Sequence, residues 1–191
     1  MENSIAGHQV VVIGVSTGGM AVLFELLPTF PATYSLPIVV VQHLHPRQDR
    51  SFIQQLDHRS ALTIKEADEK ESIEAGHVYI APPNYHLLIE DDRTFSLSVD
   101  EKVNYTRPAI DVLFESAADV YGDGVIGVIL TGANEDGARG LRSIKARGGL
   151  AIVQDPETAE APAMPQAAIA ATHVDHVLAL PEIARLLSQK G

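Results

Sequence analysis

Short, β-branched apolar runs recur along this chain, and they constrain its fold more than any other feature. Each run carries almost no polar residue, which is typical of a strand buried on both faces of a parallel sheet. Helical patterns lie between the runs. The runs span residues 10–15, 37–42, 78–81, 125–130 and 150–153, and the helical patterns span residues 20–27, 49–56, 110–120, 137–146 and 181–189.

This alternation predicts a doubly wound, mostly parallel α/β sheet of the Rossmann-like type. One stretch differs, because residues 86–90 and 94–99 flank Asp91-Asp92-Arg93 and are typical of an antiparallel β-hairpin. We expect this hairpin at one edge of the sheet. The sequence shows no internal repeat, and residues 1–191 are expected to form a single domain.

Composition excludes several classes of protein. The chain has no cysteine, which rules out a disulfide scaffold and a thiol nucleophile. Its formal net charge of −11 argues against nucleic acid as a partner, because phosphate binding needs clustered Lys and Arg. No segment approaches the ~20 consecutive apolar residues of a membrane span, and the N-terminus lacks the basic start of a signal peptide. We expect a cytoplasmic monomer that is not embedded in a membrane.

Residues that directly follow strands are the first candidates for a site, because ligands of such sheets bind at the carboxyl ends of the strands. The first strand runs into Gly14-Val15-Ser16-Thr17-Gly18, which matches the G-x-S-x-G nucleophile elbow. Such a turn leaves helix N–H groups free to cradle a phosphate or an oxyanion. A structural helix cap is the alternative role for Ser16. A nucleotide- or phosphate-binding domain ranks last, because neither G-x-G-x-x-G nor a P-loop ending is present.

A serine nucleophile needs a base and an acid that orients the base. The second strand ends at His43, beside the expected position of Ser16, whereas His45 already precedes a proline turn. The loop after residues 125–130 holds Glu135 and Asp136, and either could orient the histidine or simply favour the next helix N-terminus. The order Ser, His, Asp differs from that of the α/β-hydrolases and of the familiar serine proteases.

Several motifs in the right order make the chain similar to the catalytic domain of the chemotaxis protein-glutamate methylesterases. They lie at residues 12–19, 41–43, 76–82, 107–114, 127–138, 154–159 and 163–168. The resemblance implies that Ser16 is the nucleophile, His43 the general base and Asp136 the orienting carboxylate. It implies hydrolysis of glutamate γ-methyl esters on the cytoplasmic domain of chemotaxis receptors, through an acyl-serine intermediate, and deamidation of receptor glutamines by the same chemistry. It implies neither a metal nor an organic cofactor.

The resemblance also suggests residues that assist the reaction. Thr17 and the backbone N–H groups from Ser16 through Gly18 to Gly19 are expected to contribute to an oxyanion hole. Arg107 has two competing roles, since it can position an acidic receptor helix or serve the structure alone.

Two departures from the family pattern affect the prediction. The chain starts almost at the first strand, so we expect a standalone or excised catalytic domain without the family's phosphorylatable receiver domain. The loop that usually reads Gly-Met-Gly-x-Asp-Gly is here residues 132–137, with Ala133 and Asn134 at the second and third positions. Asn134 is expected to tolerate a positive φ, and Ala133 to widen the pocket. An esterase or amidase for another substrate, and a catalytically silent receptor-binding module, therefore stay as alternatives.

Overall fold

A seven-stranded sheet forms the centre of the molecule. The computed structural model describes residues 7–43 and 51–189. The strand order is β3-β4-β2-β1-β7-β8-β9, and every pair in it is parallel. The strands are β1 (Val10–Val15), β2 (Ile38–Gln42), β3 (Thr63–Glu66), β4 (His77–Ile80), β7 (Val125–Ile129), β8 (Leu150–Gln154) and β9 (His176–Leu178).

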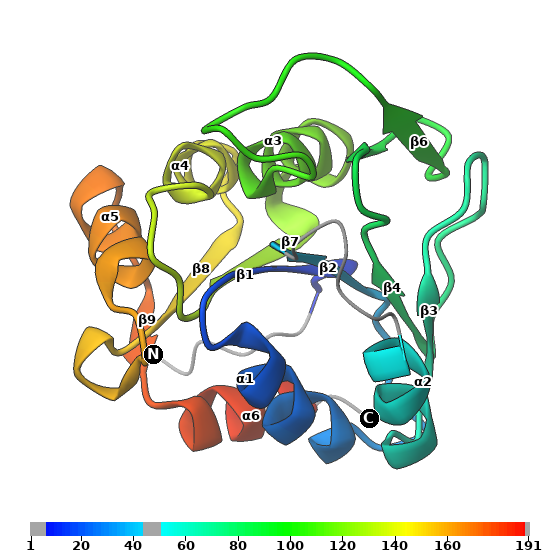
Figure 1. Ribbon diagram of the computed structural model, residues 1–191, viewed down its shortest axis with the longest axis horizontal. Coiled ribbons are helices and arrows are strands. Elements are labelled where there is room, and N and C mark those ends of the chain that lie inside the picture. Colours follow the sequence, from blue (N-terminus) through cyan, green and yellow to red (C-terminus); the bar gives the residue numbers. More distant parts are fainter. Residues whose placement is uncertain (1–6, 44–50, 190–191) are drawn as a thin grey trace.

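Helices cover both faces of this sheet (Figure 1). One face carries α1 (Gly19–Leu26), α2 (Ser51–Arg59) and α6 (Leu180–Ser188), and the other carries α3 (Ile110–Tyr121), α4 (Ala138–Ala146) and α5 (Ala163–Ala171). Short 3₁₀ helices follow α1 (Leu27–Thr29), α3 (Gly122–Gly124) and β8 (Pro156–Thr158). Along β1, Val11 and Ile13 enter one core while Val10 and Val12 enter the other. Two covered faces explain why the strands are continuous apolar runs.

The doubly wound parallel sheet predicted from the sequence is confirmed. Each predicted strand and helix is present, most of them with ends within two residues of those expected; residues 49–50 of the helix predicted at 49–56 lie outside the described residues. Strands β3 and β9 and helix α5 were not predicted from the sequence.

The predicted hairpin is also present, but its position differs from the expected one. Strands β5 (His86–Ile89) and β6 (Phe95–Ser98) pair antiparallel and form a two-stranded sheet of their own, not an addition to an edge of the large sheet. Leu87 and Phe95 are buried in the core that α3 also lines, and the Ile89 amide donates to Ser116 Oγ of α3 at 3.1 Å. The hairpin therefore packs on a helix, which buries its apolar side chains without edge pairing.

The topology brings three loops together at the carboxyl edge of the sheet. The chain leaves β1 toward β2 on one side and returns to the other side of β1 as β7. Ligand sites of open α/β sheets lie at such switch points. Hydrogen bonds continue past the strand ends, since the His43 amide donates to Val15 O (3.1 Å) and the Ser16 amide to Thr131 O (2.9 Å). In the described part of the chain, no helix is long and apolar enough to cross a membrane.

Candidate active site

Ser16 lies on a tight turn between β1 and α1. Gly18 caps α1 with a left-handed φ of 78°, a conformation that glycine adopts without strain. A Cβ on Gly18 would lie 2.7 Å from Glu160 Oε2, and a Cβ on Gly19 would lie 2.2 Å from Gln42 Oε1. Both glycines thus permit the close packing that makes Ser16 project from the strand end, as in a nucleophile elbow.

The amides of this turn differ in what they can still bind. The Ser16 amide donates to Thr131 O, and the Gly19 amide donates to Ser16 O at 2.8 Å. The Thr17 and Gly18 amides donate to no residue of the described part of the chain. The Thr17 and Gly18 amides therefore remain as the expected donors of the oxyanion hole, because the Gly19 amide already donates within the turn.

A buried glutamine holds the nucleophile loop and the base loop together. Gln42, the last residue of β2, is 3% exposed. Its Nε2 donates to the carbonyl oxygens of Ser16 and His43, both at 3.0 Å. Thr131 adds a similar link from the β7 side, where its hydroxyl donates to Thr17 O at 2.9 Å. Neither Gln42 nor Thr131 was predicted from the sequence to have a role.

The predicted base and acid are in contact. His43 Nε2 lies 2.8 Å from Asp136 Oδ2, and the two side chains are 11% and 0% exposed. An ionised carboxylate only accepts hydrogen bonds, so Nε2 carries the proton and Nδ1 of the neutral ring has a free lone pair. Nδ1 is buried and has no hydrogen-bond partner among the described residues. It is thus the ring nitrogen that can take a proton from Ser16.

Among the described residues, the Ser16 hydroxyl makes no hydrogen bond to His43. Of the alternatives left open by the sequence, His45 lies outside the described residues. Glu135 is exposed and does not bond His43, so Asp136 is the carboxylate next to the base.

Asp136 accepts hydrogen bonds on both of its oxygens. Besides His43, Oδ2 accepts from the Ile110 amide (2.7 Å) and Thr106 Oγ1 (3.3 Å). Oδ1 accepts from Asn104 Nδ2 (2.9 Å) and the Asp111 amide (3.1 Å). Burial alone would raise the pKa of Asp136, but the bonds from His43, the Ile110 amide and Asn104 outweigh it and hold the pKa below 3.8. The carboxylate therefore stays ionised at neutral pH.

Asp136 and Asp111 each accept hydrogen bonds from the N-terminus of the helix that the other residue lies in or directly precedes. Asp136 precedes α4 but binds the first two amides of α3, whereas Asp111 lies in the first turn of α3 and binds amides of α4. Asp111 Oδ1 accepts from the amides of Gly137 (3.0 Å) and Gly140 (2.7 Å). Helix N-termini favour anions. We call this arrangement of Asp111, Asp136 and the two helix N-termini the crossed caps. This arrangement was not predicted from the sequence.

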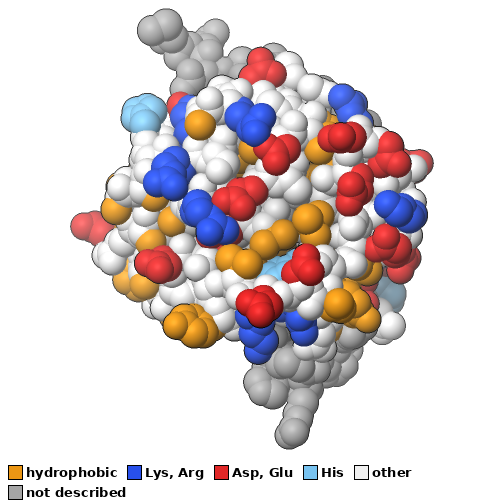
Figure 2. All heavy atoms as spheres, turned by 90° about the horizontal axis from the view of Figure 1, so that it is seen from above, with side chains coloured by type: hydrophobic (Ala, Val, Ile, Leu, Met, Phe, Trp, Pro, Cys, Tyr) orange, Lys and Arg blue, Asp and Glu red, His pale blue; other side chains and the backbone are white. Residues whose placement is uncertain are grey.

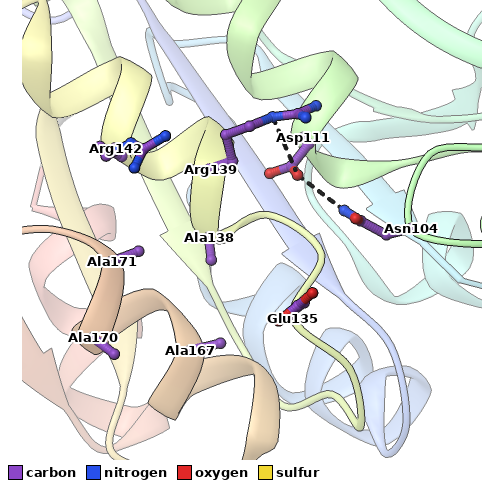
Figure 3. Close-up of a pocket in the computed structure, with 9 residues that line it drawn as sticks. All are labelled: Asn104, Asp111, Glu135, Ala138, Arg139, Arg142, Ala167, Ala170 and Ala171. Carbon is purple, nitrogen blue, oxygen red and sulfur yellow. Dashed lines mark hydrogen bonds and ion pairs between the residues drawn. The ribbon is translucent and has the colours of Figure 1, made fainter.

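Several clefts open near the loops that hold Ser16 and Asp136, and two of them bear on the site. One, of about 300 Å³, opens in front of Ser16 and is lined by Ser16, Thr17, Gly18, Gly19, Met20, Ala21, Gln42 and His43. The other, of about 460 Å³, lies between α4 and α5 and has Asn104 and Asp111 on one wall (Figure 3). Only the first contains a nucleophile and a base. In the described residues no group of His, Asp and Glu is arranged to hold a metal ion.

The surface above α3 and α4 carries charges of both signs. Figure 2 shows Lys and Arg interspersed with Asp and Glu on this face, with no large patch of one sign. A phosphate-binding surface would need clustered basic residues, and this face does not provide them.

Known proteins resemble this chain in sequence and in fold. Residues 11–187 match the family model described as CheB methylesterase. The chain belongs to the CheB methylesterase family. A relative from Leptospira interrogans (strain Fiocruz L1-130) is 57% identical over 179 residues, which cover 94% of this chain and 93% of the relative. Its name proposes the activities of a protein-glutamate methylesterase and a protein-glutamine glutaminase.

A second CheB relative comes from Thermotoga maritima and is named protein-glutamate methylesterase/protein-glutamine glutaminase. It is 40% identical over 173 residues, which cover 89% of this chain but only 50% of that protein. The crystal structure of the Thermotoga maritima CheB methylesterase catalytic domain superposes with a TM-score of 0.91 at 38% identity, covering 96% of this chain and 99% of that one. The chain thus corresponds to the catalytic half of the longer CheB protein.

The structure gives details of two residues that were discussed with the family resemblance. Asn134 does not adopt a positive φ; its Oδ1 accepts instead from the Asp136 amide at 3.1 Å and holds the loop. Arg107 donates from Nη1 to the carbonyl oxygens of Val99 (2.6 Å) and Asp100 (2.8 Å). These bonds favour the structural role for Arg107, and contact with a receptor helix stays a prediction.

Proposed function

We propose that this chain hydrolyses γ-methyl esters of glutamate side chains on the cytoplasmic domain of chemotaxis receptors, and that it deamidates receptor glutamines at the same site. The observation that carries the proposal is the buried His43–Asp136 hydrogen bond, which leaves His43 Nδ1 as a base one strand away from Ser16. Family membership supplies the substrate class. On this reading the protein works in the cytoplasm, and we expect it to act as a monomer.

The proposed reaction proceeds in two steps. Ser16 Oγ attacks the ester carbonyl while His43 Nδ1 takes its proton, and the oxyanion is stabilised by the Thr17 and Gly18 amides. The tetrahedral intermediate expels methanol, which leaves with the proton from His43. Water then attacks the glutamyl-serine ester, again with His43 as base, and releases the glutamate and free Ser16. With a glutamine substrate the leaving group is ammonia instead of methanol.

Asp136 keeps the His43 ring in the required tautomer during both steps. Its Oδ2 holds the Nε2–H and stabilises the imidazolium that forms when Nδ1 is protonated. The other hydrogen bonds to Asp136 keep this carboxylate ionised and fixed, so that it orients the ring without itself taking the proton.

The test is methanol release from a methylated cytoplasmic fragment of a chemoreceptor, with Ser16→Ala as the matched variant. Release by the wild type alone supports both the substrate and the nucleophile. Release by neither protein, with both folded, contradicts the receptor substrate. Labelling of the wild type but not of Ser16→Ala by a serine-directed fluorophosphonate would then indicate an esterase or amidase with another substrate, and labelling of neither would indicate a binding module.

A further inference from the structure

Asn104 bridges the two aspartates of the crossed caps. Its Nδ2 lies 2.9 Å from Asp111 Oδ2 and 2.9 Å from Asp136 Oδ1 (the bond to Asp111 is drawn in Figure 3). Two carboxylates that both lie within hydrogen-bonding distance of one nitrogen are close enough to repel each other unless a donor lies between them. A side-chain amide nitrogen carries two N–H groups and can donate to both carboxylates at once.

The backbone around Asn104 admits few residue types. The amides of Val103 and Thr106 each donate to the other residue's carbonyl oxygen, at 3.2 and 2.9 Å. Between them, Asn104 and Tyr105 have φ values of 50° and 63°, as in a type I′ turn. Such positions accept glycine, asparagine and aspartate far better than other residues. Of these three, only asparagine also supplies a donor.

We propose that Asn104 is a positioning residue for the hydrolase reaction: by bridging Asp111 and Asp136, it fixes the Asp136 carboxylate in the orientation that holds His43 Nε2–H and directs Nδ1 toward Ser16. The inference rests on the proposed function of Ser16, His43 and Asp136. Asn104 itself bonds neither His43 nor Ser16 and acts only through the carboxylate.

Removal of the bridge would change the carboxylate in two ways. Among the described residues, Oδ1 of Asp136 would keep the Asp111 amide as its one donor. The neighbouring Asp111 Oδ2 would keep the Arg139 guanidinium, at 3.7 Å, as its one described cationic neighbour. One of the two donors that fix Oδ1 would be lost, so the carboxylate would hold the His43 ring less firmly. The same hydrogen bond from Asn104 helps to lower the pKa of Asp136, so its loss also weakens the ionised form.

Asn104→Gly tests this role without straining the turn. Glycine adopts the positive φ at no steric cost, so the variant removes the amide alone. Asn84→Gly is the matched control, because Asn84 also has a positive φ (67°) and its exposed side chain makes no hydrogen bond in the described residues. The measurements are kcat and KM on the methylated receptor fragment and on p-nitrophenyl acetate, the melting temperature, and the downfield proton resonance of the His43 Nε2–H.

The expected result is a selective loss of turnover. For Asn104→Gly, kcat should fall roughly 10- to 100-fold on both substrates, as is typical of a misplaced catalytic group. The KM for the receptor fragment should match that of Asn84→Gly, whereas the melting temperature should be lower than that of Asn84→Gly, because the two carboxylates lose the donor between them. The His43 resonance should shift upfield or broaden. Asn104→Asp, which keeps the turn but adds a third carboxylate, should be more impaired than Asn104→Gly.

Wild-type kcat with an unchanged His43 resonance in Asn104→Gly would overturn the proposal. A lower melting temperature with an unchanged resonance would do the same, because it would reveal a purely structural role. Failure of the proposed receptor substrate would give a different result, because neither the wild type nor Ser16→Ala would then release methanol from the receptor fragment. In that case the small ester and the resonance still decide the role of Asn104.

Discussion

The two halves of the active site are built by different means. Ser16 and His43 are placed by main-chain register, since their amides continue the hydrogen bonding of β1, β2 and β7 past the strand ends. Asp136 is placed by buried side chains and helix N-termini that converge from two separate segments. The positions of the proposed nucleophile and base therefore depend on the sheet, whereas the position of the proposed acid depends on the crossed caps. The two halves should respond differently to mutation.

The largest effect on activity alone is expected at the base. His43→Gln removes the group that accepts the Ser16 proton, so kcat should fall by roughly 10³-fold or more. Since neither strand register nor a helix cap depends on this ring, the free energy of unfolding should change by less than about 1 kcal/mol. Receptor demethylation and urea unfolding measure the two quantities. A large loss of stability would show that the base also supports the fold.

Unlike His43→Gln, Asp136→Ala is expected to reduce both activity and stability. It should impair kcat about as strongly as His43→Gln, and it also leaves the Ile110 and Asp111 amides buried without an acceptor. Orphaned donors and a lost helix cap should lower the free energy of unfolding by about 3 kcal/mol. Urea unfolding beside Ser16→Ala, which should retain full stability, provides the comparison. Equal stability of the two variants would contradict the crossed caps.

Asp111→Ala is expected to reduce stability clearly and activity less strongly. The amides of Gly137 and Gly140 lose their acceptor, which should cost about 2 kcal/mol of stability. Asp136 keeps its bonds to His43 and to the α3 amides, so kcat should fall less than in His43→Gln. Urea unfolding and p-nitrophenyl acetate hydrolysis report both changes. A variant as inactive as Asp136→Ala would mean that Asp111 has a more direct role.

The pH dependence of the free energy of unfolding should show that Asp136 is ionised in the folded protein. The pKa of Asp136 is lower in the folded protein than its ordinary 3.8. Its contribution to stability is thus fully present above the unfolded pKa and is lost as the pH falls through the folded pKa. The stability advantage of wild type over Asp136→Asn should be constant from pH 7 to about 5 and shrink below about pH 4. Urea unfolding at several pH values tests this, and a constant difference down to pH 3 would contradict it.

The smallest effect is expected at the turn beside the acid. Tyr105 is 95% exposed and has a φ of 63°, which is unfavourable for a large side chain. Tyr105→Gly should stabilise the protein by about 0.5–1 kcal/mol through relief of this strain, and hydrolysis of a small ester should not change. Thermal unfolding and esterase assays provide the measurements. A destabilised variant would show that the tyrosine ring contributes to the fold.

The same contrast explains how much could be predicted from the sequence. Strands such as β1 and β2 are uninterrupted apolar runs, so their ends, and with them Ser16 and His43, were predictable from local pattern. β3 and β9 were missed because they are short and lie at the edges, and their partly exposed residues give no continuous apolar run. Helix α5 was missed because its alanine-rich sequence has no contrasting polar face.

The acid half was only partly predictable. Glu135 and Asp136 both stood out because they follow a strand in a glycine-containing loop, and only the resemblance to the methylesterases selected Asp136. Asn104 and Asp111 did not, because their role arises from contacts with residues more than 20 positions away, which no local pattern encodes. Asp111 looked like an ordinary acidic residue in a first helical turn, and Asn104 like part of a polar loop.

The central place of β1 also bears on synthesis from the N-terminus. Every residue of β1 is buried, and its second edge pairs with β7, which is made much later. Until then a nascent chain already containing Ser16 and His43 presents an apolar strand with an unpaired edge, a template for aggregation. The docking of β7 covers that edge and delivers the loop with Asp136. Hydrolytic competence and protection from misassembly should therefore arrive together, and a chain cut before β7 should be both inactive and prone to precipitate.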